Sequence, residues 1–351
     1  MSDGRPPAGN ATGQRAVSAE TPPAGAGASL GRRLRERDLE AAPATLNLLE
    51  STAPADREQA AGLLAEVSPA SLGGEAEGHI VGITGPPGAG KSTLLSALLR
   101  AWRERGATVA MLAVDPSSRR SGGSLLGDRA RIEFDPADRG VFIRSTAAGE
   151  RLGGIAWGTR AAAQALAAAF DVVVIETVGV GQAETEIGEV ADTVVVVVQP
   201  GSGDVLQFLK SGIMEIPDVL VVTKADLGQV ALSARRDLSA ASRSLGTRST
   251  RVLAVSSLPP ASGIDVLREA LAEHWRELGE DGGRARRARR LRARRAGALT
   301  SFTVEHGERG LRALGGRRAA ERWLADQDEA LDEAALVAGL ERRMSSGGHD
   351  T

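Results

Sequence analysis

The sequence has no cysteine among its 351 residues, which excludes disulfide bonds, thiolate metal sites and cysteine nucleophiles. Histidine occurs four times, at positions too scattered to suggest a zinc or nickel cluster. Aromatic residues make up only 3% of the chain, so we expect an aliphatic core. Lysine is also rare, since 40 of the 43 basic residues are arginine and only Lys91, Lys210 and Lys224 are lysine.

Two further absences concern membranes and polyanions. The first residues lack the apolar core of a signal peptide, and no apolar run reaches the ~18 residues that a membrane-spanning helix needs. The formal net charge is only -2, so the chain as a whole is not built to seek polyanions. We therefore expect a soluble, cytoplasmic protein without a membrane partner.

Composition changes several times along the chain. Residues 1–28 are rich in Gly, Ala, Pro, Ser and Thr, which predicts a disordered tail. Charged residues interleaved with leucine predict a helical extension over 29–75. An α/β domain is expected over 76–280, followed by a helical arm over 281–344 and a polar tail over 345–351. The length therefore suits one main domain with appendages.

Seven short apolar runs alternate with helical stretches in the predicted α/β domain. Several of them, such as Val194 to Val198, are apolar without alternation, as expected for strands that helices cover on both faces. This pattern predicts a doubly wound, mostly parallel sheet of about seven strands. The expected strands span residues 79–84, 108–115, 141–144, 171–177, 193–199, 218–223 and 251–256.

A phosphate-binding loop is predicted after the first strand. The pattern GxxxxGK[ST] lies between that strand and an amphipathic helix, and it comprises Gly85, Pro86, Pro87, Gly88, Ala89, Gly90, Lys91, Ser92 and Thr93. Such a loop curls so that backbone N–H groups and the following helix N-terminus face a phosphate. Lys91 can then reach the β and γ phosphates, and the Ser92 hydroxyl can bind Mg²⁺. The sequence therefore predicts a P-loop protein that binds a nucleoside triphosphate.

Acidic residues follow the neighbouring strands. Because ligands bind at the carboxyl ends of the strands in such sheets, Asp115 and Glu176 are expected to face the nucleotide, with Asp128 as a further candidate ligand of Mg²⁺ or water. Gly179 follows Glu176 closely and could sense the γ-phosphate through its N–H. Loss of that phosphate would release this loop.

The base is predicted from the run Thr223-Lys224-Ala225-Asp226, which has the form of the guanine-reading [NT]KxD element. A carboxylate at Asp226 can accept hydrogen bonds from guanine N1–H and the 2-amino group, whereas adenine lacks this donor pair. The Lys224 stem would pack along the base. Ser256, Ser257 and Leu258 follow the seventh strand, and the two serines could offer backbone N–H groups to guanine O6. These features favour GTP over ATP.

Together these segments make the chain resemble the MeaB/ArgK-type GTPases, which are accessory proteins of adenosylcobalamin-dependent acyl-CoA mutases such as methylmalonyl-CoA mutase. The resemblance covers about residues 30–278. It is carried by GITGPPGAGKST at 82–93, AVDPSSRRSGGSLLGDRARI at 113–132, FIRSTAAGERLGGIA at 142–156, IETVGVGQAE at 175–184, QPGSGD at 199–204 and TKAD at 223–226. Thr223 departs from the family pattern, where Asn usually ties this loop to the phosphate loop.

The resemblance implies Mg²⁺-dependent hydrolysis of GTP, a homodimer with a C-terminal helical arm, and GTP-gated loading of adenosylcobalamin onto a mutase. The mutase, not this chain, would hold adenosylcobalamin. The family also has a third switch loop, which would match Gly201, Asp204 and Lys210.

Three other function classes stay open at this point. A P-loop kinase could transfer the γ-phosphate to a small acceptor, although the base-reading element has no purpose in an ATP kinase. A metal-insertion GTPase is the second alternative, which the absence of Cys and the dispersed His disfavour. The third is a nucleic-acid binder, suggested by the eight arginines of Arg284–Arg295.

That arginine block has a simpler interpretation. Acidic residues lie on both sides of it, so we expect a solvated helix or arm face whose arginines pair with those acids. The acids concerned are Glu269, Glu273, Glu277, Glu280, Glu305 and Glu308.

Overall fold

The structure is a computed structural model that describes residues 25–115, 132–147, 155–177, 183–201, 217–244 and 250–347. Its centre is a seven-stranded sheet in the spatial order β3-β2-β4-β1-β5-β6-β7, in which all neighbouring strands are parallel. The strands are β1 (His79–Thr84), β2 (Val109–Asp115), β3 (Val141–Ala147), β4 (Val172–Thr177), β5 (Thr193–Val198), β6 (Val219–Val222) and β7 (Arg251–Ala254). The predicted fold class is therefore confirmed.

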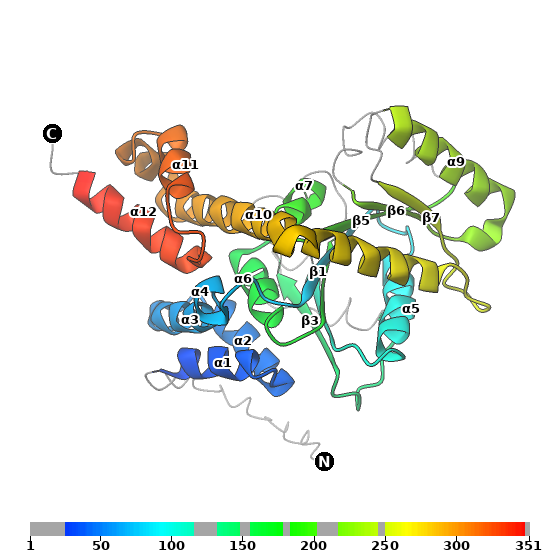
Figure 1. Cartoon of the computed structure of the whole chain (residues 1–351), viewed down its shortest axis with the longest axis horizontal. Helices are drawn as coiled ribbons and strands as arrows, with labels where there is room; N and C mark the ends of the chain where they lie inside the picture. The colour runs from blue at the N-terminus through cyan, green and yellow to red at the C-terminus, as the bar shows by residue number, and fades with distance from the viewer. Residues whose placement is uncertain are drawn as a thin grey trace, which may run out of the picture.

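Helices cover both faces of the sheet, which explains why its strands do not alternate between apolar and polar residues (Figure 1). Val81 and Ile83 belong to a core that includes α5 (Lys91–Arg103) and the start of α10 (Ile264–Ala313). Ile80 of the same strand belongs to the core on the other face, which contains α6 (Trp157–Leu166), α7 (Ala183–Gly188) and α9 (Gln229–Ser244).

Short N-terminal helices extend this second core. They are α1 (Ala26–Arg35), the 3-10 turn η1 (Leu39–Ala41), α2 (Ala42–Leu49), α3 (Pro54–Glu66) and α4 (Pro69–Leu72). The helices α1 and α3 pack together, and α2 packs on α6. Leu34, Leu46 and Leu63 are fully buried there, so the extension is joined to the α/β core by apolar packing.

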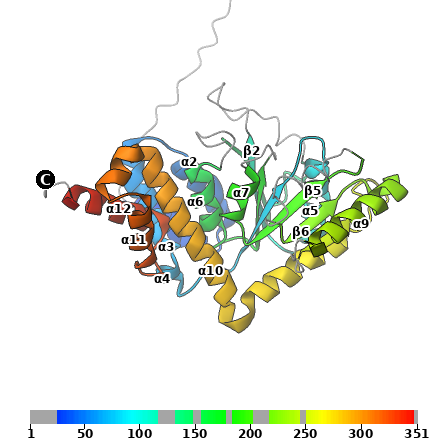
Figure 2. The same cartoon turned by 90° about the horizontal axis from the view of Figure 1, so that it is seen from above.

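The long helix α10 is bent and crosses from the sheet to the C-terminal helices (Figure 2). Its backbone leaves the helical region from Glu280 to Gly283, where Asp281, Gly282 and Gly283 have φ values of 51°, 66° and 76°. Glycine adopts these left-handed values at little cost, which lets the helix change direction. A second break occurs at Gly307, with φ 59°.

Beyond the bend, α10 packs with α11 (Arg317–Ala325) and α12 (Glu333–Gly347) around a core of their own. Phe302 and Leu340 are fully buried at its centre. No helix in the described part of the chain has the length and apolar character needed to cross a membrane.

The predicted solvated face of Arg284–Arg295 is wrong for Arg289, Arg290 and Arg294, because the bend carries these three onto the amino ends of the strands. Arg284, Arg287 and Arg292 are exposed, as expected. Arg290 and Arg294 are only 5% and 4% exposed. Arg290 donates to both oxygens of Asp192, at 2.9 and 2.7 Å, and to the carbonyls of Ala76 and Gly78. Arg294 donates to both oxygens of Glu75 at 2.9 Å.

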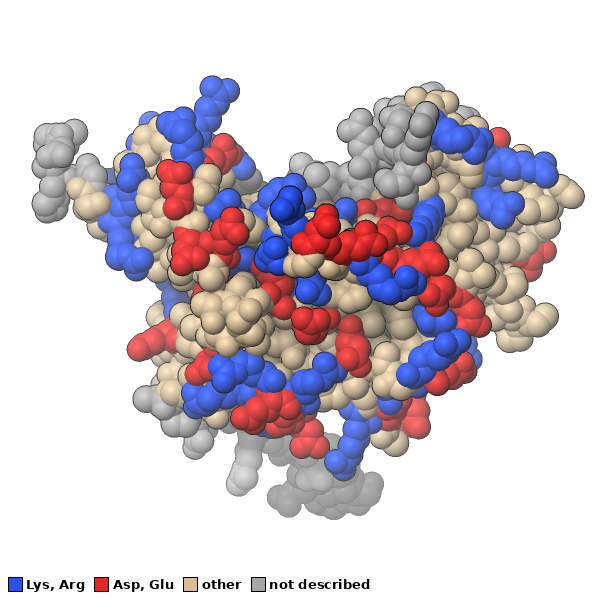
Figure 3. All heavy atoms as spheres, viewed as in Figure 1, with Lys and Arg blue, Asp and Glu red and all other residues tan. Residues whose placement is uncertain are grey.

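The acids expected to neutralise the block pair elsewhere. Glu273 and Glu277 bind Arg251 of β7, and Glu305 binds Arg57 of α3. In Figure 3 acidic and basic side chains are interspersed over the visible face, without a broad basic field. The arginine block therefore connects parts of this chain, which removes much of the basis for a nucleic-acid partner.

Candidate functional site

The loop between β1 and α5 has the shape that a phosphate loop requires. Gly85 has φ 150°, and a Cβ at this position would lie 2.1 Å from the Val197 carbonyl oxygen. Gly90, the last residue before α5, has φ 88°. Both positions therefore require glycine, the first because β5 lies against it and the second because of its left-handed backbone. The predicted loop between strand and helix is in place.

Lys91 is buried within this loop, with only 6% of its surface exposed. Its Nζ donates to the carbonyl oxygens of Gly85 and Pro86, at 2.7 and 3.0 Å. A compact ammonium fits between these two carbonyls, where it can turn toward an incoming phosphate. Ser92 lies half-buried in the first turn of α5.

Glu176 stands near the carboxyl end of β4, beside this loop. It pairs in register with Ile83 of β1 and is buried, with 8% of its surface exposed. Asp115 is the last residue of β2, which also pairs with β4. The Ser92 hydroxyl and the Glu176 carboxylate are hard oxygen donors, which is the chemistry that Mg²⁺ prefers. Four other predicted residues, Asp128, Gly179, Asp204 and Lys210, lie outside the described residues.

The base-reading loop is tied directly to the phosphate loop. Thr223 is buried, and its Oγ1 lies 2.7 Å from the Ala89 carbonyl oxygen and 3.2 Å from that of Val198. The side chain that departs from the family pattern thus also ties this loop to the phosphate loop. Lys224 follows with φ 54°, and its Nζ donates to Gln199 Oε1 at 2.6 Å.

Asp226 lies in the turn η5 (Ala225–Leu227), where the Ala225 N–H donates to the Val255 carbonyl. The exposed carboxylate of Asp226 accepts a hydrogen bond of 2.8 Å from the buried Ser256 hydroxyl. The predicted backbone role of Ser256 is contradicted, because its N–H already donates to the Ser262 carbonyl at 2.9 Å. Ser256 therefore holds the carboxylate, which leaves Ser257 as the proposed donor to guanine O6.

Two other predicted residues, Gly201 and Leu258, lie in the described part of the chain. Gly201 lies at the start of the proposed third switch, with φ 81°, and a Cβ there would lie 3.6 Å from Val230. Leu258 is 57% exposed beside the base-reading turn. Lys224, Asp226 and Leu258 are thus all accessible to solvent.

Two histidines that are distant in sequence meet at the amino ends of the strands, opposite the candidate site. The Thr193 hydroxyl lies 2.6 Å from His79 Nε2 and 2.8 Å from His274 Nδ1. The His79 ring stacks on Trp275, which Arg290 also covers. Burial lowers the pKa of His79 to about 3, although the charge of Asp192 opposes this effect. The ring is therefore neutral, and no spacing in the sequence indicated this contact.

A group of potential metal ligands lies in the arm. The side chains of Glu305, His306 and Glu341 place one potential ligand atom each within 4.8 Å of one another. His306 Nε2 lies 3.1 Å from Glu341 Oε1, while Glu305 is already paired with Arg57. No sequence pattern indicated this group, because Glu341 follows 35 residues after His306.

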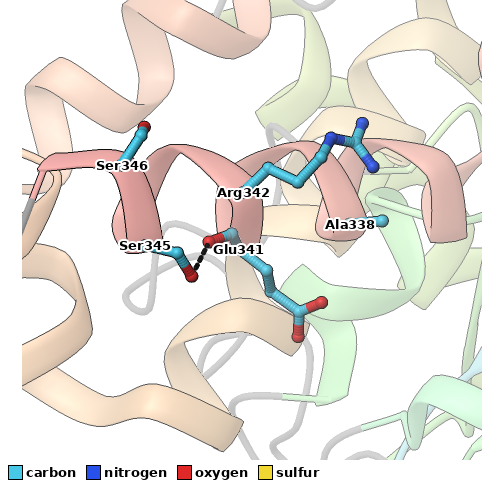
Figure 4. A pocket seen from close by; sticks show the side chains of 5 residues that line it. All are labelled: Ala338, Glu341, Arg342, Ser345 and Ser346. Atoms are coloured by element: carbon cyan, nitrogen blue, oxygen red, sulfur yellow. Dashed lines mark hydrogen bonds between the residues drawn. The ribbon is translucent and has the colours of Figure 1, made fainter.

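A surface hollow on α12 does not contribute to the nucleotide site. All five residues that line it belong to this helix: Ala338, Glu341, Arg342, Ser345 and Ser346. Figure 4 shows Ser345 donating to the Glu341 carbonyl, a bond of 3.0 Å within the helix. The lining groups do not converge on a common point, so the phosphate loop and base-reading loop remain the candidate site.

The chain is similar to several known proteins. The family described as methylmalonyl-CoA mutase-associated GTPase MeaB matches residues 21–308. A protein of Pyrococcus abyssi named as a GTPase is 43% identical over 261 residues, which cover 72% of this chain and 77% of that protein. The mitochondrial methylmalonic aciduria type A homolog of mouse is 42% identical over 160 residues, or 44% of this chain and 38% of the mouse protein.

A solved structure extends the similarity to the arm. The crystal structure of a LAO/AO transport system kinase covers 92% of this chain and 98% of its own, with a TM-score of 0.62 and 26% identity. The family match spans both the phosphate loop and the base-reading loop. The chain therefore belongs to the MeaB family and is a P-loop GTPase.

Proposed function

We propose that this GTPase serves an adenosylcobalamin-dependent acyl-CoA mutase, such as methylmalonyl-CoA mutase. Its nucleotide state would gate loading of adenosylcobalamin and protect the loaded enzyme, which itself holds that cofactor. The family description supports this role, because it names a methylmalonyl-CoA mutase-associated GTPase. The observation that carries the proposal is this family match over a chain whose base-reading loop is joined to its phosphate loop through Thr223.

Hydrolysis of GTP is proposed to follow from charge neutralisation and positioning. Water attacks the γ-phosphorus and GDP leaves, so negative charge develops on the phosphate oxygens that the loop N–H groups and Lys91 face. Ser92 and Glu176, with Asp115 and Asp128, are proposed to hold Mg²⁺, which when bound neutralises charge on the phosphates. Gly179 remains the proposed sensor of the γ-phosphate.

Selectivity for guanine is proposed to rest on Asp226. Its carboxylate, held by the Ser256 hydroxyl at 2.8 Å, would accept from guanine N1–H and the 2-amino group. Against adenine it would face no donor pair, so part of its hydration would be lost without replacement. Lys224 adopts the left-handed conformation at the start of the turn that carries Asp226, and its stem would pack along the base.

The proposal predicts that a purified acyl-CoA mutase accelerates GTP turnover by this protein and that GTP changes cofactor transfer to that mutase. We would measure phosphate release and adenosylcobalamin loading with and without each partner, using Lys91→Ala as the inactive control. If methylmalonyl-CoA mutase and related mutases leave GTP turnover unchanged, and GTP leaves their cofactor loading unchanged, the proposed role is wrong. Light scattering on the same preparation tests the proposed homodimer, for which a monomeric mass would be the contrary result.

A kinase activity is the second candidate, because the similar solved structure is described as a transport system kinase. The turnover assay separates the two functions. Hydrolysis delivers labelled γ-phosphate to water, whereas a kinase would deliver it to a small acceptor such as an amino acid. The guanine-reading loop favours hydrolysis of GTP as the reaction.

A further inference from the structure

The residue that follows β5 contacts the base-reading lysine. Gln199 comes directly after this strand and is half-buried. Lys224 is exposed, and its Nζ donates to Gln199 Oε1 at 2.6 Å. A charged donor makes such a bond short and comparatively strong. The ammonium of this lysine therefore has a defined partner within the protein itself.

The backbone on both sides of this contact is fixed by the sheet. Val198 pairs in register with Val222 of β6, and its carbonyl accepts from the Thr223 N–H at 2.9 Å. The segments that leave β5 and β6 therefore start side by side, which places Gln199 next to the base-reading loop (Figure 1). The Thr223 hydroxyl also bonds to the Ala89 carbonyl of the phosphate loop. The end of β5 is thus held in place relative to both loops.

The conformation of Lys224 also indicates a local constraint. Its backbone has φ 54° and ψ 43°, in the left-handed region that residues with a Cβ seldom adopt. Such conformations persist where the surrounding structure holds them, and they cluster at ligand-binding sites. A lysine stem is long and flexible, so ordering an unrestrained one when the base binds would reduce the affinity. A bond between Gln199 and the far end of the stem lowers that cost.

We propose that Gln199 is a positioning residue for nucleotide binding, which holds the Lys224 ammonium so that the lysine stem is in place to receive the base. The inference rests on the proposed function in one respect, namely that this stem packs along the base. The stem would contact the face of the base, whereas Asp226 would read its edge. Guanine and hypoxanthine present similar faces and differ at the edge by the 2-amino group. Gln199 should therefore increase the affinity for GTP and for inosine triphosphate by the same factor, while Asp226 sets the ratio between them.

The first test is Gln199→Met in the full chain, because methionine has a similar length but no amide oxygen. We expect the dissociation constants of GTP, GDP and inosine triphosphate each to rise by about three- to tenfold, the range for one hydrogen bond. The KM for GTP should rise, with kcat little changed. Gln199→Glu keeps an acceptor for the ammonium and should bind GTP more tightly than Gln199→Met does. Calorimetry and phosphate release measure these effects.

Lys224→Met completes a double-mutant cycle. Alone it should weaken GTP binding at least as much as Gln199→Met does, and adding Gln199→Met to it should cause no further loss. Gln327→Met is the matched control, because it removes a side-chain hydrogen bond of 2.9 Å to the Trp323 carbonyl in the arm. The affinity of this control for GTP should equal that of the unmodified protein.

Unchanged affinity in Gln199→Met, or additive losses in the double variant, would overturn the inference. A loss confined to GTP, with inosine triphosphate bound as before, would also contradict it, since Gln199 would then act on the edge of the base. If Lys224→Met binds GTP normally, the proposed packing of Lys224 on the base is wrong and the inference fails with it. A loss in Lys224→Met without a loss in Gln199→Met contradicts the inference alone, so the two failures are distinguishable.

Discussion

Thr223 shows how far a single residue could be predicted from its neighbours. Its place in the base-reading run was evident from the sequence, yet a threonine there weakened the expected connection to the phosphate loop. In the structure its hydroxyl reaches the Ala89 carbonyl, because β6 ends beside the loop and a short side chain suffices. Ser256 shows the converse, since a bridge to Ser262 that no pattern predicted occupies its backbone N–H.

Asp226 gives the prediction at this scale. Asp226→Asn replaces an acceptor pair with an amide, so affinity for GTP should fall by about 10-fold or more, while xanthosine triphosphate should bind better than it does to the unmodified protein. Calorimetry with GTP, ATP and the xanthine nucleotide measures this. Asp237→Asn on α9 is a control that carries the same chemical change elsewhere. Equal affinity of the unmodified protein for ATP and GTP would contradict the assignment.

At the scale of elements, the apolar runs predicted the strand positions well. The surroundings of the arginine block were predicted wrongly, because they depend on a bend in α10. The strand positions followed from apolar runs buried between helix layers, although β3 extends to Ala147, three residues beyond the expected end. The direction of α10 depends on three successive left-handed residues, and composition could not reveal which acids Arg284–Arg295 would meet. Asp192 and Asp218 are far from the arginine block in sequence. They become its ion-pair partners only because β5 and β6, which they precede, lie side by side in the sheet.

Arg290 offers a test of this docking. Arg290→Met should leave the fully buried carboxylate of Asp192 without its main partner and destabilise the protein by about 3–5 kcal/mol. Adding Asp192→Asn should recover part of that loss, since the uncompensated charge is then removed. Denaturant unfolding of the two single variants and the double variant measures the coupling. Strictly additive losses would show that the two side chains do not act as a pair.

At the scale of the whole molecule, the near-zero net charge does not indicate how stability should depend on pH. A buried histidine predicts that acid destabilises the protein. His79 is buried and neutral, with its pKa lowered to about 3 by desolvation, whereas an unfolded histidine has a pKa of about 6.5. The unfolded chain therefore binds more protons between these values. The contribution of His79 to stability is fully present above about pH 6.5 and is lost as the pH falls toward 3.

We expect His79→Gln to flatten the pH dependence of unfolding across this window, by up to about 3 kcal/mol. Denaturation midpoints from pH 7 to pH 4 give the measurement. His306→Gln in the arm is the matched control, because that ring is only half-buried. A pH profile of His79→Gln parallel to that of the unmodified protein would mean that other groups set its acid sensitivity.

The bend in α10 also decides how the molecule could be divided. A chain that stopped at residue 280 would keep the phosphate loop, the base-reading loop and all seven strands. It would nevertheless expose the amino ends of β1, β5 and β6, and it would leave Asp192, Asp218 and Glu75 without the arginines that now neutralise them. The nucleotide-binding part is therefore not separable from the second half of α10. In this protein the limits of the catalytic unit and the limits of the folding unit do not coincide.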